Sequence, residues 1–132
     1  MTGRKVALRV DRHTLAKRRW RGVAEDGREF GFDLDHALAD GAMFFADDEK
    51  GYVIVQSSEP VLELRIADCG LRIENATRIG WKIGNLHFQI EIADGVIRVA
   101  DDPALRQLFE REGWKYQARE AIFHPLGGGH TH

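Results

Sequence analysis

The sequence predicts an α+β protein in which a small all-β N-terminal domain precedes a C-terminal domain that mixes strands and helices. From residue 5 to residue 59, short apolar runs alternate with turn dipeptides, as is typical of an all-β domain. After Pro60, strand-like and helix-like periods follow in the order β-α-β-β-α-β. With 132 residues, 43% of them hydrophobic, the chain can form one ordinary domain or two small ones, and a disordered chain is excluded.

The first domain, residues 1–59, is expected to contain about six short strands with no helical period. The dipeptide Asp26-Gly27 indicates a hairpin, because both residues tolerate the positive φ of a tight turn. In the following strand Phe30, Phe32 and Leu34 recur with period two, so they share one face. The predicted strand segments are 6–10, 20–24, 29–34, 42–45 and 52–55.

The second domain, residues 60–123, is expected to fold as a four-stranded antiparallel sheet under two helices, the split β-α-β arrangement. The first helix is predicted from an Asp68 N-cap to a stop at Gly84, and the second from Pro103 to Gly113. The predicted strands are 61–66, 86–92, 96–99 and 115–123. Residues 124–132 cannot pack and are expected to form a flexible tail.

Charge and cysteine content restrict the function classes. Residues 1–31 carry nine basic and four acidic side chains, a charge of +5, which leaves −7 for the remainder. This basic N-terminal segment could attract an acidic partner or nucleic acid to one end of the protein. Alternatively, its charges could simply lie on solvent-exposed faces of strands. No apolar run is long enough for a membrane helix or a signal core, and the lone Cys69 fits a reducing compartment, so we expect a cytoplasmic protein.

Motifs of catalysis are missing from the sequence. There is no Gly-rich phosphate loop, no Gly-x-Ser-x-Gly elbow, no His-Glu-x-x-His and no paired cysteine motif. The acidic residues lie mostly in turns and first helical turns, where they suit caps and solvent. We therefore expect a protein that is not an enzyme.

The histidines point to metal binding, since imidazole is the commonest side-chain ligand of borderline divalent metals. His87 alternates with apolar residues in the predicted strand 86–92, on the sheet face away from the helices. A two-fold axis at that face would bring two His87 imidazoles to one point, whereas a lone exposed histidine is otherwise inert. His130 and His132 follow three glycines and could fold back onto such a metal, or belong to a solvated terminus or a cloning-tag remnant.

The run Gly-Trp-Lys-Ile-Gly-Asn-Leu-His-Phe-Gln-Ile-Glu, residues 80–91, resembles the helix-to-strand signature of the UreE family of urease accessory proteins. That family typically has His-Leu-Gly-Asn-Arg-His, two residues and Gln-Ile-Glu here. The resemblance extends to Asp11-Arg12, the hairpin at residues 26–29, Asp102 with the helix after it, and the Ala-Ile-Phe-His-Pro run at residues 121–125.

The resemblance implies a homodimeric nickel metallochaperone that binds Ni²⁺ and delivers it for assembly of the urease active site. It implies a peptide-binding-like N-terminal domain and a ferredoxin-like βαββαβ C-terminal domain that dimerises and binds metal. His87 would be the interface ligand, and His130 and His132 the tail ligands. The implied partners are the urease apoprotein and its accessory complex, including the nickel-insertion GTPase. Zn²⁺ or Cu²⁺ would also bind such a site in vitro.

Some positions depart from the family pattern. Trp81-Lys82 leaves no second histidine before the signature, and Asp102 is followed by proline where many relatives have histidine. With only two tail histidines, few metal ions per dimer are expected. His124 stands where an acidic residue is frequent and is the least supported ligand candidate.

Two rival functions use the same sequence differently. A nucleic-acid-binding module would use the basic segment at residues 17–21, Lys-Arg-Arg-Trp-Arg, and a sheet topology shared with RNA-binding domains. An adaptor would bind urease components without metal. Oligonucleotide binding that depends on salt separates the first rival from a nickel carrier, and nickel titration separates the second.

Overall fold

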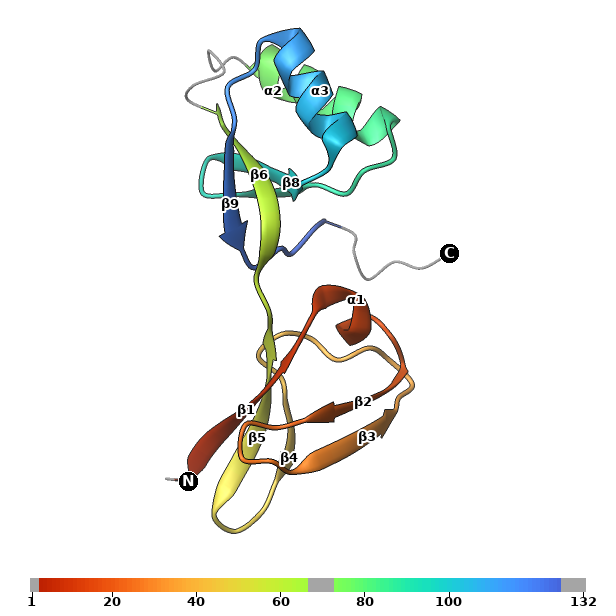
Figure 1. Ribbon diagram of the computed structural model, residues 1–132, viewed down its shortest axis with the longest axis vertical. Coiled ribbons are helices and arrows are strands. Elements are labelled where there is room, and N and C mark those ends of the chain that lie inside the picture. The colour runs from red at the N-terminus through yellow and green to blue at the C-terminus, as the bar shows by residue number, and fades with distance from the viewer. Residues whose placement is uncertain (1–2, 67–72, 127–132) are drawn as a thin grey trace. The chain divides into compact units, whose positions relative to one another are not determined.

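The computed structural model describes residues 3–66 and 73–126 (Figure 1). The chain divides into two compact units, Met1–Ser57 and Ser58–His132. The predicted N-cap Asp68, Cys69 and the tail histidines His130 and His132 lie outside the described residues. The α+β fold class is confirmed, with a β-rich N-terminal part and a ferredoxin-like C-terminal part.

The N-terminal unit contains two small sheets. One has the order β1-β5-β4, with β1 parallel to β5 and β4 antiparallel to it, and the other is the β2–β3 hairpin. The strands are β1 (Arg4–Val10), β2 (Arg19–Val23), β3 (Glu29–Asp33), β4 (Met43–Ala46) and β5 (Lys50–Gln56). Within residues 3–57, this unit therefore has five strands where the sequence suggested about six.

The hairpin turn is fixed to a neighbouring strand by Asp26. Its carboxylate accepts hydrogen bonds from Lys50 Nζ and Tyr52 Oη, both at 2.7 Å, and these bonds together with the Arg28 N–H hold the pKa of Asp26 well below its usual range. Gly27 has a φ of 91°, as the hairpin prediction requires. Phe30 and Phe32 both pack against the core of this unit, so their predicted common face is confirmed.

One helix of this unit was not predicted. The single turn α1 (Arg12–Leu15) is capped by Asp11, whose side chain accepts a hydrogen bond from the Thr14 N–H at 2.9 Å. A helix of four residues is too short to show a period, so only its cap residue marked it in the sequence.

The C-terminal unit is a four-stranded antiparallel sheet of order β7-β8-β6-β9. Its strands are β6 (Glu59–Arg65), β7 (Glu91–Ala93), β8 (Val96–Ala100) and β9 (Gln117–Ala121), and its helices are α2 (Ile73–Asn85) and α3 (Pro103–Glu112). Both helices lie on the same side of the sheet (Figure 1). Of the helices in the described residues, none has the length and apolar character that crossing a membrane requires.

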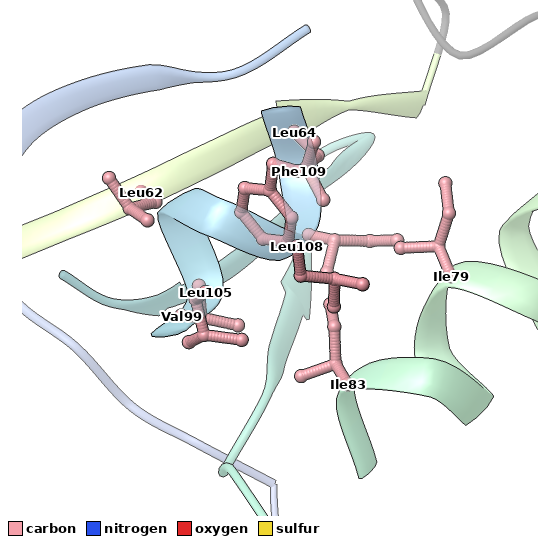
Figure 2. Close-up of a cluster of buried hydrophobic side chains, with 9 residues drawn as sticks. Leu62, Leu64, Ile79, Ile83, Val99, Leu105, Leu108 and Phe109 are labelled. Carbon is pink, nitrogen blue, oxygen red and sulfur yellow. The ribbon is translucent and has the colours of Figure 1, made fainter. Parts of the chain in front are cut away.

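The core of this unit lies between the helices and one face of the sheet (Figure 2). Leu62 and Leu64 of β6 stand opposite Val99 and Ile97 of β8, so alternate residues of each strand face the helices. The helical contribution comes from Ile79, Ile83, Leu105, Leu108 and Phe109. The face of the sheet away from the helices carries the other residues of each strand.

The ends of α3 match their sequence signals. Asp102 caps its start by accepting a hydrogen bond from the Ala104 N–H at 2.8 Å, and Pro103 stands in the first turn. Gly113 ends the helix in the left-handed conformation, with a φ of 73°.

Replacing Gly113 with alanine is expected to lower the free energy of unfolding of this unit by about 1 kcal/mol, because a Cβ is strained at this positive φ. The matched control is Gly80→Ala inside α2, where an added Cβ meets no atom within 4 Å. The control is expected to raise stability by roughly 0.5–1 kcal/mol. Urea unfolding followed by circular dichroism at 222 nm tests both, and equal effects of the two substitutions would contradict this account.

Candidate metal site

His87 lies in a turn directly after α2. Its N–H donates to the Gly84 carbonyl at 2.8 Å, and the preceding Leu86 N–H donates to the Ile83 carbonyl at 3.1 Å. The φ of His87 is 67°, a left-handed conformation that glycine or asparagine usually occupies at the end of a helix. A histidine in this position turns the chain sharply and leaves its side chain exposed.

The prediction that residues 86–92 form one strand is wrong. Only Glu91–Ala93 pairs with β8, and residues 86–90 form the turn and an irregular link. The apolar alternation that suggested a strand has another cause. Phe88 and Ile90 are partly buried against the core although their segment has no partner strand. The Ile90 carbonyl accepts instead from the Leu126 N–H of the C-terminal segment, at 2.6 Å.

Exposed apolar side chains accompany His87 along the chain. Trp81 is 66% exposed, Leu86 45% and Ile92 53%, although residues of these types are ordinarily buried. All three lie within six residues of His87 in the sequence. Apolar side chains beside an exposed imidazole are typical of a surface that contacts a partner.

The remaining histidines of the described residues lie elsewhere. His13 and His36 belong to the N-terminal unit and are exposed. His124 follows β9; its N–H donates to Glu91 Oε1 at 3.2 Å, and its Nδ1 lies 4.0 Å from Glu91 Oε2. Within residues 3–66 and 73–126, no three His, Cys, Asp or Glu side chains gather so that they could hold a metal ion. Within these residues, His87 therefore belongs to no group of three potential ligands.

A network of charges lies on the face of the sheet away from the helices. Arg98 donates to Glu63 Oε2 at 2.6 Å and to Glu91 Oε1 at 2.9 Å, and Arg119 lies 3.4 Å from Glu63. Burial disfavours the charge of Arg98, but its hydrogen bonds to the two carboxylates outweigh this effect and raise its pKa. Glu63 and Glu91 are buried, so Arg98 is shared between two carboxylates that water reaches poorly, and Arg119 supplies a second positive charge beside Glu63.

This network was not predicted from the sequence, although a signal for it is present. Glu63 and Arg98 each stand between apolar residues in the middle of a strand, and Glu91 stands between two isoleucines at the start of β7. A single charge in that position is typical of a sheet face that is half-buried. Which charges pair depends on the register, which places Glu63 and Glu91 on either side of Arg98.

The structure does not support base stacking on the sheet. RNA-binding sheets of this topology stack bases on exposed aromatic residues of the central strands. Here the central strands are β6 and β8, whose sequences contain no aromatic residue. Phe88, the aromatic residue nearest to β7, packs against the core.

A family model and individual relatives both connect the chain with urease accessory proteins. The C-terminal domain of the UreE urease accessory protein family matches residues 59–132. The chain is 32% identical over 132 residues to the urease accessory protein UreE of Azotobacter vinelandii (strain DJ), an alignment that covers 95% of this chain and 77% of that protein. With the UreE of Pseudomonas fluorescens (strain SBW25) it shares 32% identity over 124 residues, covering 89% of this chain and 72% of that protein.

Other relatives are longer than this chain. The UreE of Rhodopseudomonas palustris (strain BisB18) is 31% identical over 123 residues, which cover 92% of this chain but 55% of that protein. The chain therefore spans about half the length of that relative.

Proposed function

We propose that this chain, which belongs to the UreE urease accessory protein family, binds Ni²⁺ at the interface of a homodimer and donates it for assembly of the urease active site. An accessory protein assists an enzyme, so the family agrees with the expectation that the chain is not itself an enzyme. The observation that carries the proposal is the exposed imidazole of His87 in a left-handed turn between exposed apolar side chains.

A homodimer would complete the site because each chain supplies one His87. In a two-fold interface every residue on the axis meets its own copy, so two imidazoles converge on one ion. Leu86 and Ile92 would lose their water contact in such an interface, which favours association. Imidazole nitrogen suits nickel, and also zinc and copper, so Zn²⁺ and Cu²⁺ are expected to bind in vitro as well.

The length of the chain after Leu126 would allow the tail histidines to reach His87 of the same chain. The hydrogen bond between Leu126 N–H and the Ile90 carbonyl holds the start of the tail three residues away from His87. From Leu126, the six residues to His132 can extend by about 20 Å, whereas the three residues from Ile90 to His87 span at most about 11 Å. His130 and His132 can therefore supply exchangeable ligands, which suit a carrier that must release its metal.

The remaining proposals concern partners. The N-terminal unit exposes Val23, Met43 and Phe45, apolar side chains that fit a peptide-binding-like role toward a protein partner. We expect these partners to be the urease apoprotein and its accessory complex with the nickel-insertion GTPase, in the cytoplasm.

Deleting residues 127–132 is expected to weaken nickel binding or to lower the nickel-to-protomer ratio, while the dimer stays intact, because the tail supplies ligands but no interface. Native mass spectrometry gives the ratio, and calorimetry gives the affinity. The matched variant, His130→Ala with His132→Ala, keeps the tail length and should behave like the deletion. Unchanged affinity and ratio in both would exclude the tail from the site, and a wild-type chain that binds no nickel would refute the proposed function.

A further inference from the structure

The β2–β3 hairpin (Figure 1) has one face in the core of the N-terminal unit and one exposed face. Trp20 of β2 stands directly opposite Phe32 of β3; Trp20 is buried, and Phe32 packs against the same core. Alternate residues of each strand point the other way. They form what we call the hairpin outer face, which consists of Arg19, Arg21 and Val23 of β2 and Glu29, Gly31 and Asp33 of β3.

The centre of the hairpin outer face is an arginine with no side chain opposite it. Directly paired residues of an antiparallel ladder point to the same face, and Arg21 is paired with Gly31. Arg21 lies beside this glycine, because a Cβ added at Gly31 would be 3.8 Å from Arg21 Nε. Arg21 is exposed and has no hydrogen bond or ion pair with another described residue. Its guanidinium is therefore open to an anion from outside the chain.

Further positive charges precede Arg21 in the chain. Lys17 and Arg18 are exposed and have no ion pair within the part of the chain that the structure describes. Arg19 lies 3.4 Å from Asp33, but the two side chains are 82% and 78% exposed, so water screens this pair. Residues 17–21 thus contain four cations and no anion. Such a cluster attracts acidic molecules.

The other residues of the hairpin outer face favour a protein over nucleic acid. Surfaces that bind single-stranded nucleic acid add exposed aromatic side chains to their cations, whereas the aromatic residues of this hairpin pack against the core. Glu29 and Asp33 would repel a phosphate backbone, in which every unit is negative. Val23 is 58% exposed on the same face and offers an apolar contact. This mixture is complementary to a peptide in which carboxylates alternate with apolar side chains.

We propose that the hairpin outer face binds an acidic segment of a partner protein. A carboxylate of the segment accepts two parallel hydrogen bonds from Arg21, and an apolar side chain next to it packs on Val23. Lys17 and Arg18 attract the segment and raise its association rate. The proposal goes beyond the proposed function by giving the chemistry of one partner surface. It does not depend on nickel, because all of these residues belong to the N-terminal unit.

Fluorescence anisotropy of the full chain with a labelled peptide of alternating glutamate and leucine residues tests this surface. The wild-type chain should bind the peptide, and Arg21→Glu should weaken binding at least about tenfold, because charge-assisted hydrogen bonds give way to repulsion. The matched control is Lys115→Glu, which makes the same charge change at an exposed position of the C-terminal unit and should bind like the wild type. Equal losses in the two variants would show an effect of net charge and overturn the proposal.

A second variant occupies Arg21 without removing a cation. Gly31→Glu places a carboxylate opposite Arg21, at a position where the added Cβ makes only an ordinary contact. The new cross-strand pair should keep the urea midpoint at or above the wild-type value and should weaken peptide binding about as much as Arg21→Glu does. Wild-type affinity in a folded Gly31→Glu chain would overturn the role of Arg21.

A single-stranded oligonucleotide of the same length separates the two classes of partner. At the same salt concentration it should bind the wild-type chain more weakly than the acidic peptide does. Tighter binding of the oligonucleotide would assign the surface to nucleic acid and overturn the proposal. A wild-type chain that does not bind the peptide would also overturn it, and neither result would affect the proposed nickel site, which is tested by nickel titration.

Discussion

Replacing His87 with asparagine is expected to lower the nickel affinity of the full chain at least about tenfold. Removing only a hydrogen-bond partner of a metal ligand already lowers metal affinity by about that factor. The dimer would lose both imidazoles of the proposed interface site at once. Asparagine is the appropriate substitute because it tolerates the left-handed φ of 67° that His87 adopts. Isothermal titration calorimetry with Ni²⁺ measures the affinity, and thermal unfolding should show an unchanged midpoint.

The control for this substitution is His36→Asn, which removes an exposed histidine from the N-terminal unit. It should leave both nickel affinity and stability at the wild-type values. Alanine is less informative at position 87, because a Cβ without a compensating polar group is strained at positive φ and adds a stability change. Tight nickel binding by a folded His87→Asn dimer would show that the metal lies elsewhere.

The placement of His87 illustrates what the sequence could predict. The sequence predicted that the first helix of this unit stops at Gly84, and α2 ends one residue later, at Asn85. The period-two pattern after it predicted that Leu86, Phe88, Ile90 and Ile92 face the helices. Phe88 and Ile90 do pack against the core, but Leu86 and Ile92 are exposed. The pattern could not show that residues 86–90 lack a partner strand, because strand pairing depends on residues distant in the chain. Here Leu126 bonds to Ile90.

Local signals elsewhere were reliable where a single residue determines the geometry. Asp102, Pro103 and Gly113 marked α3 to within a residue, because caps and positive φ are properties of the residues themselves. The hydrogen bond between Glu91 and the His124 N–H could not be predicted from single residues. It joins residues 33 positions apart and arises only after β9 and β7 have taken opposite edges of one sheet.

Replacing Arg98 with methionine is expected to cost about 3–5 kcal/mol in the free energy of unfolding of the C-terminal unit at pH 7. The substitution leaves the carboxylates of Glu63 and Glu91, whose side chains are 8% and 12% exposed, without their shared cation. Methionine fills a similar volume and leaves little cavity, so the loss of stability reflects mainly the missing positive charge. Urea unfolding by circular dichroism measures it.

Two comparisons identify the cause of this loss. Arg106→Met removes the more exposed pair with Asp101, and it should cost much less than Arg98→Met because water screens that pair. Arg98→Lys, which keeps the positive charge, should lose less stability than Arg98→Met. Equal losses in the two variants would show that Arg98 contributes packing and not charge.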